Sequence, residues 1–528
     1  MMKQAKIWKW LCAALWILQF AVEALTVYSI ARLDMLPDQY LWLVAGAFGF
    51  LWVLMGLLLL PGKNHTGGIR RSIAAVLVLI ICVGCAVAVA VVSDVYEAMQ
   101  GVLGQPGNNE TKPTRSVYVM KDDPAQTLIE AKGYTFAVVE NFDTANVQQV
   151  LDAIEAVHGQ QPKTQTYGSL SAMVDALYNG EVDAIIVSNA NLLILESQDA
   201  YVDFHDEARI LYEMEIVEQL PPPTAAPTDP SNPDDPDPTE PPTEPPTEPA
   251  VTVPVIVKPQ DITNTPFIVY VAGSDTRNYY LGNSRNDVNI LAVVNPETKQ
   301  ILLINTPRDY FVKNPAGNGA RDKLTHCGIY GVENSALALG NLYGDRIDYY
   351  AQINFAGFET FIDAIDGITV YSDVSFTTNE GTYVSKGENH LYGADALAFA
   401  RERYSFSSGD EARGQNQMKV IRAVIQKMTS GTTIITRYAE ILDSLEGMFS
   451  TNLTMAEIGQ LVKMQLSDMA SWNILSYAVS GYGDYDYTYS APGEDLYVMW
   501  PDMDMVAHAT ELIDRVIAGE ILTQSDLG

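Results

Sequence analysis

The sequence predicts an α/β protein in which two folded units follow a membrane anchor of three transmembrane helices. Three observations lead to this prediction. Apolar stretches of roughly twenty residues, the length needed to cross a bilayer, recur within the first 95 residues. A proline-rich segment divides the rest of the chain. On each side of it, short strand-like runs alternate with amphipathic helical patterns, which is typical of α/β layers.

Residues 1–95 form the predicted transmembrane region, with helices at about 7–30, 40–60 and 73–92. The second and third stretches carry no charge. The first contains Lys9 and Glu23, so an uncleaved signal anchor or an interfacial helix stays open for it. Lysines precede the first stretch and further basic residues lie between the second and third, which predicts a cytoplasmic N-terminus. Three crossings place everything after residue 92 outside the membrane.

The predicted outer part of the chain is acidic and poor in cysteine. The whole chain has a net charge of -33, which argues against nucleic acid as a partner. Cys327 is the one cysteine after the membrane stretches, so no disulfide forms within the outer part. This cysteine usage favours the outer face of a bacterial cell over a disulfide-rich secreted protein.

Residues 221–250 read PPPTAAPTDPSNPDDPDPTEPPTEPPTEPA. The segment contains no bulky apolar residue and no Lys or Arg, so it cannot bury a core. Proline favours an extended backbone, and the acidic side chains repel one another. The sequence therefore predicts a disordered spacer between two folded units.

Residues 113–220 form the first predicted unit, an α/β lobe with parallel strands. Strand-like runs at 116–120, 135–139 and 182–187 alternate with helix-like segments. The string YGSLSAMVDALYNGEVDAIIV at 167–187 resembles one lobe of extracellular solute-binding proteins. A complete protein of that class has two lobes around a cleft. A structural or docking role therefore stays open beside ligand binding.

Residues 260–528 form the second predicted unit, a mixed central sheet flanked by helices. Apolar runs at 267–272, 288–294 and 300–304 are the strand candidates, and helical patterns follow at 335–342, 394–400 and 411–428. Amphipathic helices are also expected at 434–449, 455–469 and 503–518. Some 260 residues can bury a large core.

Two aspartates of this unit are candidate metal ligands. Asp275 follows the strand candidate at 267–272, and Asp287 precedes the next one. Neighbouring strands would bring both carboxylates to one edge of the sheet, and two carboxylates with a substrate phosphate are a usual coordination of Mg²⁺. The alternative is that each aspartate caps a turn.

Several arginines lie beside turns and strand ends of a chain that has only 32 Lys+Arg against 65 Asp+Glu. Arg308 follows an apolar strand, where it could also pair with Asp309. Arg401 and Arg403 are two residues apart, so their guanidinium groups face the same way in an extended chain and could grip a diphosphate. The alternative is an exposed pair on either side of Glu402.

A predicted helix start follows these arginines. Asp410 and Arg413 lie in its first turn, where the helix dipole favours phosphate, and Asp410 could equally be a simple N-cap. Gln417 is one turn after Arg413, on the same face.

Five motifs of the second unit occur in the order typical of one family. They are VAGSDTR (271–277), RNDVNILAVVNPETKQILLINTPRD (285–309), KLTH (323–326), DYYAQINFAGFETFIDAIDGITV (348–370) and ALAFARERYSFSSGDEARGQNQ (396–417). By these motifs the chain from about 267 to 427 resembles the LytR–CpsA–Psr (LCP) cell-envelope family.

The resemblance implies a role for each matching residue. Asp275 and Asp287 would hold Mg²⁺, with Mn²⁺ as a possible substitute. Arg308, Arg401, Arg403 and Asp410 would take part in catalysis, Asp410 by orienting an arginine or deprotonating the acceptor. The carrier phosphates would be bound by Arg277, Arg285, Lys323, Arg413 and Gln417. Asn416 stands where the family often has arginine; the loss of one cation predicts weaker binding of pyrophosphate or a different donor.

The resemblance also implies a function. Enzymes of this family take a glycan from a polyprenyl (pyro)phosphate carrier at the membrane and join it to peptidoglycan by a phosphodiester bond. It further implies an apolar pocket for the polyprenyl chain, whose lining the sequence does not identify. Two alternatives stay open: a hydrolase that uses water as acceptor, and an envelope sensor without enzymatic activity.

Overall fold

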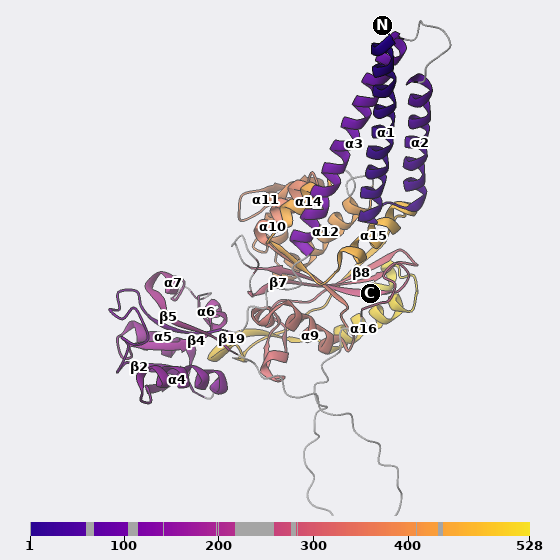
Figure 1. Cartoon of the computed structure of the whole chain (residues 1–528). Coiled ribbons are helices and arrows are strands. Elements are labelled where there is room, and N and C mark those ends of the chain that lie inside the picture. Colours follow the sequence, from indigo (N-terminus) through magenta and orange to yellow (C-terminus); the bar gives the residue numbers. More distant parts are fainter. Residues whose placement is uncertain are drawn as a thin grey trace, which may run out of the picture.

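The computed structural model describes residues 2–59, 68–103, 114–140, 142–196, 198, 200–216, 258–275, 281, 283–407, 409–430 and 437–528. The predicted spacer at 221–250 lies outside these residues, as does Arg277. Figure 1 shows three long helices that lead into two α/β units.

The anchor consists of α1 (Met2–Leu33), α2 (Asp38–Leu59) and α3 (Gly68–Leu103), which run side by side (Figure 1). All three are long and apolar enough to cross a membrane, as the sequence predicts. Two polar residues in the middle of α1, Gln19 and Glu23, face the inside of the bundle. Both are buried, and Gln19 donates a hydrogen bond of 2.8 Å to Glu23. This placement explains how a helix with a carboxyl group can still present an apolar surface to lipid.

One end of the anchor packs directly on the second unit. Lys463 forms ion pairs of 3.1 Å with Asp34 and with Asp38, at the connection between α1 and α2. Near the C-terminal end of α3, Val95 and Met99 pack against Leu442. The α1–α2 connection and the second unit therefore lie at the same end of the bundle, and the N-terminus lies at the other (Figure 1).

The lobe at 114–216 has a five-stranded sheet of order β3-β2-β4-β1-β5, with apolar clusters on both of its faces. Its elements are β1 (Thr114–Met120), β2 (Thr135–Val139), α4 (Thr144–His158), β3 (Lys163–Tyr167), α5 (Leu170–Tyr178), β4 (Ala184–Val187), α6 (Asn189–Leu195), α7 (Phe204–Glu207) and β5 (Ala208–Glu215). β2 pairs in parallel with β3 and β4, as predicted, whereas β1 runs antiparallel to β4 and β5. The sheet is therefore mixed: β5 runs in the same direction as β2, β3 and β4, and the prediction of parallel strands is wrong for β1 alone.

The second unit is built on a six-stranded mixed sheet of order β16-β11-β6-β7-β8-β17. Its strands are β6 (Phe267–Ser274), β7 (Asn286–Asn295), β8 (Gln300–Asn305), β11 (Tyr349–Asn354), β16 (Phe449–Thr451) and β17 (Asn473–Ala478). β6, β7 and β8 are antiparallel neighbours, whereas β11 joins β6 and β17 joins β8 in parallel. Every residue of β8 is buried, because helices cover both faces of the sheet.

Helices form a layer on each face of this sheet. α9 (Val332–Tyr343) and α16 (Met503–Ile517) pack on one face. The other face meets α12 (Asp410–Thr429), which contributes Met418 to a cluster with β7 and β8. Behind α12 lie α10 (Phe355–Ala364), α11 (Gly393–Arg401) and α14 (Tyr438–Leu445), and α15 (Met455–Asp468) lies beside the anchor (Figure 1). The mixed α/β fold predicted from the sequence is confirmed.

Short strands and turns surround the central sheet. They are β9 (Phe311–Lys313), β10 (Arg321–Lys323), α8 (Leu324–Cys327), β12 (Ile368–Ser372), β13 (Phe376–Thr377), β14 (Tyr383–Val384) and β15 (Gly387–Leu391). The 3₁₀ turns η1 (Pro315–Gly317) and η2 (Gly328–Tyr330) lie next to β9, β10 and α8. Cys327, in α8, is fully buried in the main core.

An antiparallel ribbon that the sequence analysis missed completes the unit. It consists of β18 (Gly481–Thr488) and β19 (Ala491–Pro501). Its tip contacts the lobe: Ser171 N donates to Glu494 Oε1 at 3.0 Å, and Asn191 Nδ2 donates to the carbonyl of Ser490 at 2.7 Å. Its other end joins β9, where Met499 N donates to the carbonyl of Asp309 at 2.8 Å. The ribbon therefore links the lobe to the second unit.

Candidate active site

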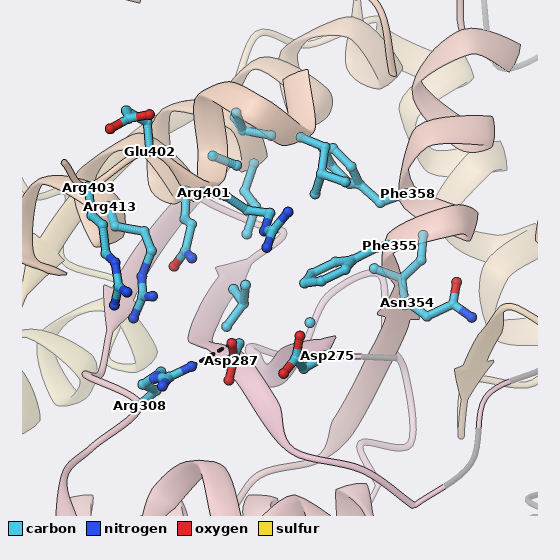
Figure 2. Close-up of a pocket in the computed structure, with 18 of the residues that line it drawn as sticks. Asp275, Asp287, Arg308, Asn354, Phe355, Phe358, Arg401, Glu402, Arg403 and Arg413 are labelled. Atoms are coloured by element: carbon cyan, nitrogen blue, oxygen red, sulfur yellow. Dashed lines mark hydrogen bonds and ion pairs between the residues drawn. The ribbon is translucent and has the colours of Figure 1, made fainter. Parts of the chain in front are cut away.

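A cavity of about 410 Å³ lies between the central sheet and the helices α10, α11 and α12 (Figure 2). Polar and charged residues gather on one side of it, and apolar side chains form the rest of the wall. Its lining includes Asp275, Asp287, Arg308, Arg401, Arg403, Arg413 and Gln417 from the predicted site. Residues that are more than a hundred positions apart in the sequence therefore meet in one place.

The two candidate metal ligands come from neighbouring strands, as predicted. Asp275 directly follows β6, and Asp287 is the second residue of β7. The strand register shifts between Gly273 and Ser274, at the point where the two strands reach the cavity. Figure 2 shows both carboxyl groups pointing into the cavity from its floor.

Arginines already contact both carboxylates. Arg285 pairs with Asp275, and Arg308 Nη1 lies 2.6 Å from Asp287 Oδ2. Thr325 Oγ1 donates to the other oxygen of Asp287 at 3.1 Å. Burial raises the pKa of Asp275, the nearby carboxylate of Asp287 raises it further, and Arg285 opposes both. A carboxylate whose pKa is raised by a neighbouring carboxylate favours the binding of a cation between the two.

The donor set of this pair fits Mg²⁺. Among the described residues, no group of three or more His, Cys, Asp or Glu side chains gathers as a metal site. Two carboxylates without a third protein ligand leave coordination positions for water and for substrate phosphate, which is how Mg²⁺ is commonly held at phosphate sites.

The arginines approach the cavity from two directions. Arg308 follows β8, and Arg403 and Arg413 extend side by side toward the same region from the loop after α11 and from the first turn of α12 (Figure 2). Arg401, the last residue of α11, lies instead over the ring of Phe355, 4.8 Å from its centroid. Arg401 and Arg403 thus line one cavity, as predicted, but at different places along its wall.

Glu402 holds the segment between these two arginines in place. Its side chain accepts hydrogen bonds from Asn379 N at 2.6 Å and from Ser405 N at 2.8 Å, and the residue is only 2% exposed. Burial raises the pKa of Glu402, but the backbone donors outweigh it and hold the pKa below its usual value. Glu402 is therefore a buried anchor of this segment, while the arginines on either side of it line the cavity.

The start of α12 contributes further residues. Gln417 is buried and lines the cavity one turn after Arg413. Asn416 is buried too, but its amide donates to the carbonyl of Phe399 at 3.3 Å, and it is not among the lining residues. Asp410 is the first residue of α12, and its side chain lies outside the described part of the structure.

Two predicted phosphate ligands do not line the cavity. Arg285 reaches it only through its ion pair with Asp275. Lys323 Nζ lies 3.2 Å from Asp309 Oδ1, and Arg308 Nε lies 3.6 Å from the other oxygen of the same carboxylate. Burial raises the pKa of Asp309, but Lys323 and Arg308 outweigh it and hold the pKa below its usual value. Lys323 is thus placed to support Arg308 through Asp309.

The residues that form the apolar wall of the cavity were not predicted from the sequence. Ile353 is the last residue but one of β11, Phe355 and Phe358 lie on α10, and Leu397 lies on α11. Phe355 and Phe358 are three residues apart on one helix face, which is a signal the sequence does carry. Asn379 and Glu380 belong to the loop between β13 and β14, where nothing in the sequence predicts a contact with the arginines.

Comparison with known proteins agrees with the motif pattern. Residues 244–503 match the LytR_cpsA_psr family. "Polyisoprenyl-teichoic acid--peptidoglycan teichoic acid transferase TagU" of Bacillus anthracis is 32% identical over 199 residues, which cover 38% of this chain and 64% of that protein. The protein of the same name from Enterococcus faecalis is 33% identical over 198 residues, or 37% of this chain and 64% of its own. The chain thus spans 64% of the length of these curated relatives.

Solved structures are similar over about half of the chain. Lin1025 protein from Listeria innocua is 29% identical, with a TM-score of 0.40, over 48% of this chain and 100% of that one. Bacillus subtilis TagU is 25% identical, with a TM-score of 0.38, over 49% of this chain and 100% of that one. Residues 244–503 of this chain, which carry the five ordered motifs, therefore form a domain of the LytR–CpsA–Psr family.

Proposed function

We propose that this protein is a membrane-anchored phosphotransferase that moves a glycopolymer from a polyprenyl (pyro)phosphate carrier onto peptidoglycan through a phosphodiester bond. The observation that carries the proposal is one cavity whose wall combines four arginines, a carboxylate pair and a large apolar surface. The relatives named above are teichoic acid transferases that act between a polyisoprenyl-linked polymer and peptidoglycan, as their names state.

The two sides of the cavity fit the two parts of such a carrier. Guanidinium groups bind phosphate oxygens through paired N–H donors, which suits Arg308, Arg403 and Arg413 to a pyrophosphate. The apolar wall around Phe355 and Phe358 suits a hydrocarbon chain. Arg401, stacked on Phe355, lies where the charged and the apolar parts of the ligand would meet.

The proposed reaction is a displacement at the phosphorus that carries the glycan. The hydroxyl oxygen of the acceptor forms a new bond to this phosphorus, and the bond from the phosphorus to the oxygen bridging to the lipid phosphate breaks. Polyprenyl phosphate leaves with the electron pair, and the acceptor proton passes to a carboxylate, for which Asp410 is the candidate. The arginines stabilise the charge that builds up on the phosphate oxygens.

Asp275 and Asp287 would hold Mg²⁺, or Mn²⁺ in its place. When bound, the ion would neutralise charge on the phosphate oxygens of the carrier. Arg285 and Arg308, which contact these carboxylates, would then be displaced in part or shared with the phosphates.

The proposed orientation places the catalytic unit outside the cell. Basic residues near the N-terminus and at Lys63, Arg70 and Arg71 favour the cytoplasmic side for that end of the bundle. The contact of Lys463 with Asp34 and Asp38 puts the α1–α2 connection and the catalytic unit on the opposite side. This is the side on which an exported lipid-linked glycan meets peptidoglycan.

The test is a transfer assay with purified protein, polyprenyl-pyrophosphate-linked glycan, peptidoglycan and Mg²⁺. An Arg401→Ala, Arg403→Ala double variant should lose nearly all wall-linked product. Lys419→Ala is the matched control, because it removes a cation from α12 that pairs with Asp373 away from the cavity. Normal transfer by the double variant would contradict the proposal. Release of free glycan phosphate by the unaltered protein, without wall-linked product, would identify a hydrolase instead.

A further inference from the structure

One face of the ribbon β18–β19 exposes a cluster of tyrosines. Successive residues of a strand point to opposite faces, so Gly483, Tyr485 and Tyr487 share one face of β18. Opposite them in register are Met499, Tyr497 and Asp495. Tyr485 and Tyr487 are each 65% exposed and Tyr497 is 40% exposed.

Two of the three tyrosine rings contact each other, and the face that carries all three is called the platform below. Tyr485 and Tyr497 meet edge to face, with their centroids 6.0 Å apart. Gly483 lies so close to this pair that a Cβ there would come within 2.8 Å of the Tyr497 ring. A larger residue at this position would therefore displace or cover the Tyr497 ring. Tyr485 and Tyr487 are two residues apart along the strand, about 7 Å, which is comparable to the length of one sugar unit.

The charge of the ribbon restricts what can bind to it. Residues 481–502 include five acidic residues and no Lys or Arg, and one of the acids, Asp495, lies on the face of the tyrosines. An anionic polymer or a nucleic acid is repelled by such a surface. Carboxylates accept hydrogen bonds from sugar hydroxyl and amide groups, and aromatic rings pack against the C–H faces of sugars. The platform therefore suits an uncharged glycan.

The position of the ribbon relates the platform to the cavity. Met499 lies on the same face as the tyrosines. Its backbone N–H donates to the backbone carbonyl of Asp309, the residue after Arg308. The platform thus begins beside the arginine side of the cavity and runs outward for about four residues, or roughly 13 Å, to Asp495. A glycan strand on this face would lead toward the place where phosphate is bound.

We propose that the face of Tyr485, Tyr487 and Tyr497 binds the glycan strand of the acceptor, a neutral polymer of N-acetylated sugars. The identification of this glycan as the acceptor rests on the proposed transferase function, whereas the binding of a glycan to the tyrosines does not. An anionic glycopolymer on its lipid carrier is thereby kept from this face and reaches the arginines by another route.

The experiment is a sedimentation assay of the purified full chain in detergent with insoluble peptidoglycan from which anionic polymers have been removed. A Tyr485→Ala, Tyr487→Ala double variant should bind at least about tenfold more weakly, which corresponds to about 1.4 kcal/mol. The double variant Tyr485→Phe, Tyr487→Phe keeps both rings and should bind within about threefold of the unaltered protein. Tyr482→Ala is the matched control, because Tyr482 is 66% exposed on the opposite face, where it bonds to Asp502.

Competition identifies the bound part of the polymer. Soluble oligosaccharides of N-acetylglucosamine should displace the protein, and free stem peptides or teichoic acid should not. Unchanged binding by a folded alanine variant, or displacement by stem peptides alone, would overturn the proposal. If the protein binds glycan through these tyrosines but shows no transfer, the proposed function fails while the glycan site stands.

Discussion

The two α/β units of this protein use similar layers for different purposes. In the second unit, β6 and β7 place Asp275 and Asp287 at a cavity that helices cover. In the lobe, α5 and α6 begin at Ser169 and Ser188, whose side chains cap their first turns. The ribbon of the second unit contacts these helix starts through Glu494 and Ser490.

The difference shows that the fold class alone does not create a site. A helix start and a strand end are polar places in any α/β layer, since backbone N–H groups there need partners. In the lobe, a carboxylate from the same chain supplies the partner for Ser171. In the second unit, arginines and carboxylates line the cavity, which a ligand can enter. We expect substitutions in the cavity to change chemistry and substitutions at the lobe contact to change docking.

Loss of Arg308 should have the largest effect. Its guanidinium contacts Asp287 and Asp309 and lines the cavity, so Arg308→Ala removes charge stabilisation where phosphate is bound. We expect the rate of transfer to fall by about 10²–10³-fold, as for other electrostatic stabilisers. Initial rates at saturating acceptor measure the effect, with Lys419→Ala as control. A rate within threefold of the unaltered protein would remove Arg308 from the mechanism.

Lys323 should matter for stability more than for phosphate binding. Lys323→Met leaves buried Asp309 with one cationic partner fewer, which we expect to cost about 2 kcal/mol of unfolding free energy at neutral pH. A lowered pKa means that Asp309 stabilises the fold above about pH 4, and that this contribution is lost as the pH falls through its folded-state pKa.

The difference between the unaltered protein and Lys323→Met should therefore be largest at neutral pH and shrink on acidification. Urea unfolding across this range tests it. A constant difference at every pH would show that the ion pair is not its source.

Asp275→Asn should weaken Mg²⁺ binding by at least about tenfold, or about 1.4 kcal/mol, because one of the two proposed carboxylate ligands loses its charge. Calorimetric titration with Mg²⁺ measures the affinity without any substrate. Asp373→Asn removes an exposed carboxylate that pairs with Lys419 and serves as the control. Equal affinities of the two variants would argue against a metal at Asp275.

Glu494→Ala should have the smallest effect. It removes one hydrogen bond to the backbone of Ser171, worth about 0.5–1.5 kcal/mol. Hydrogen exchange at the first turn of α5 should become faster, while transfer stays within about threefold. A large loss of transfer would instead show that the lobe acts on the cavity through the ribbon.

Most of the fold of the second unit could be predicted, because the patterns that indicate its strands and helices are local in the sequence. β7 and β8 are apolar and joined by a turn, so their pairing follows from their spacing. The positions of Asp275 and Asp287 at one edge follow from the same pairing. The arginines were recognised by residue type and order, as was the neighbouring Asp309 as a partner of Arg308. The ion pair of Arg308 with Asp287 was not, since it joins residues from different strands.

The missed features depend on tertiary contacts. The string GYGDYDYT in β18 alternates tyrosine with aspartate, so it lacks the apolar face by which strands are usually recognised. Glu402 is acidic and lies between two arginines, yet backbone N–H groups from two loops bury it. The antiparallel pairing of β1 and β5 depends on how the last strand of the lobe returns to the sheet, which no local pattern specifies.

The length of α3 links the cavity to the thickness of the bilayer. Its 36 residues extend for about 54 Å, whereas the hydrocarbon core of a membrane measures about 30 Å. The remainder is a rigid rod that ends on Leu442 of α14, and α14 packs against α10, the helix of Phe355 and Phe358. A thinner or thicker membrane changes the tilt of such a helix. Because α3, α14 and α10 are packed in series, we expect a change of this tilt to move the apolar wall, so that membrane thickness would affect the space for the proposed lipid substrate.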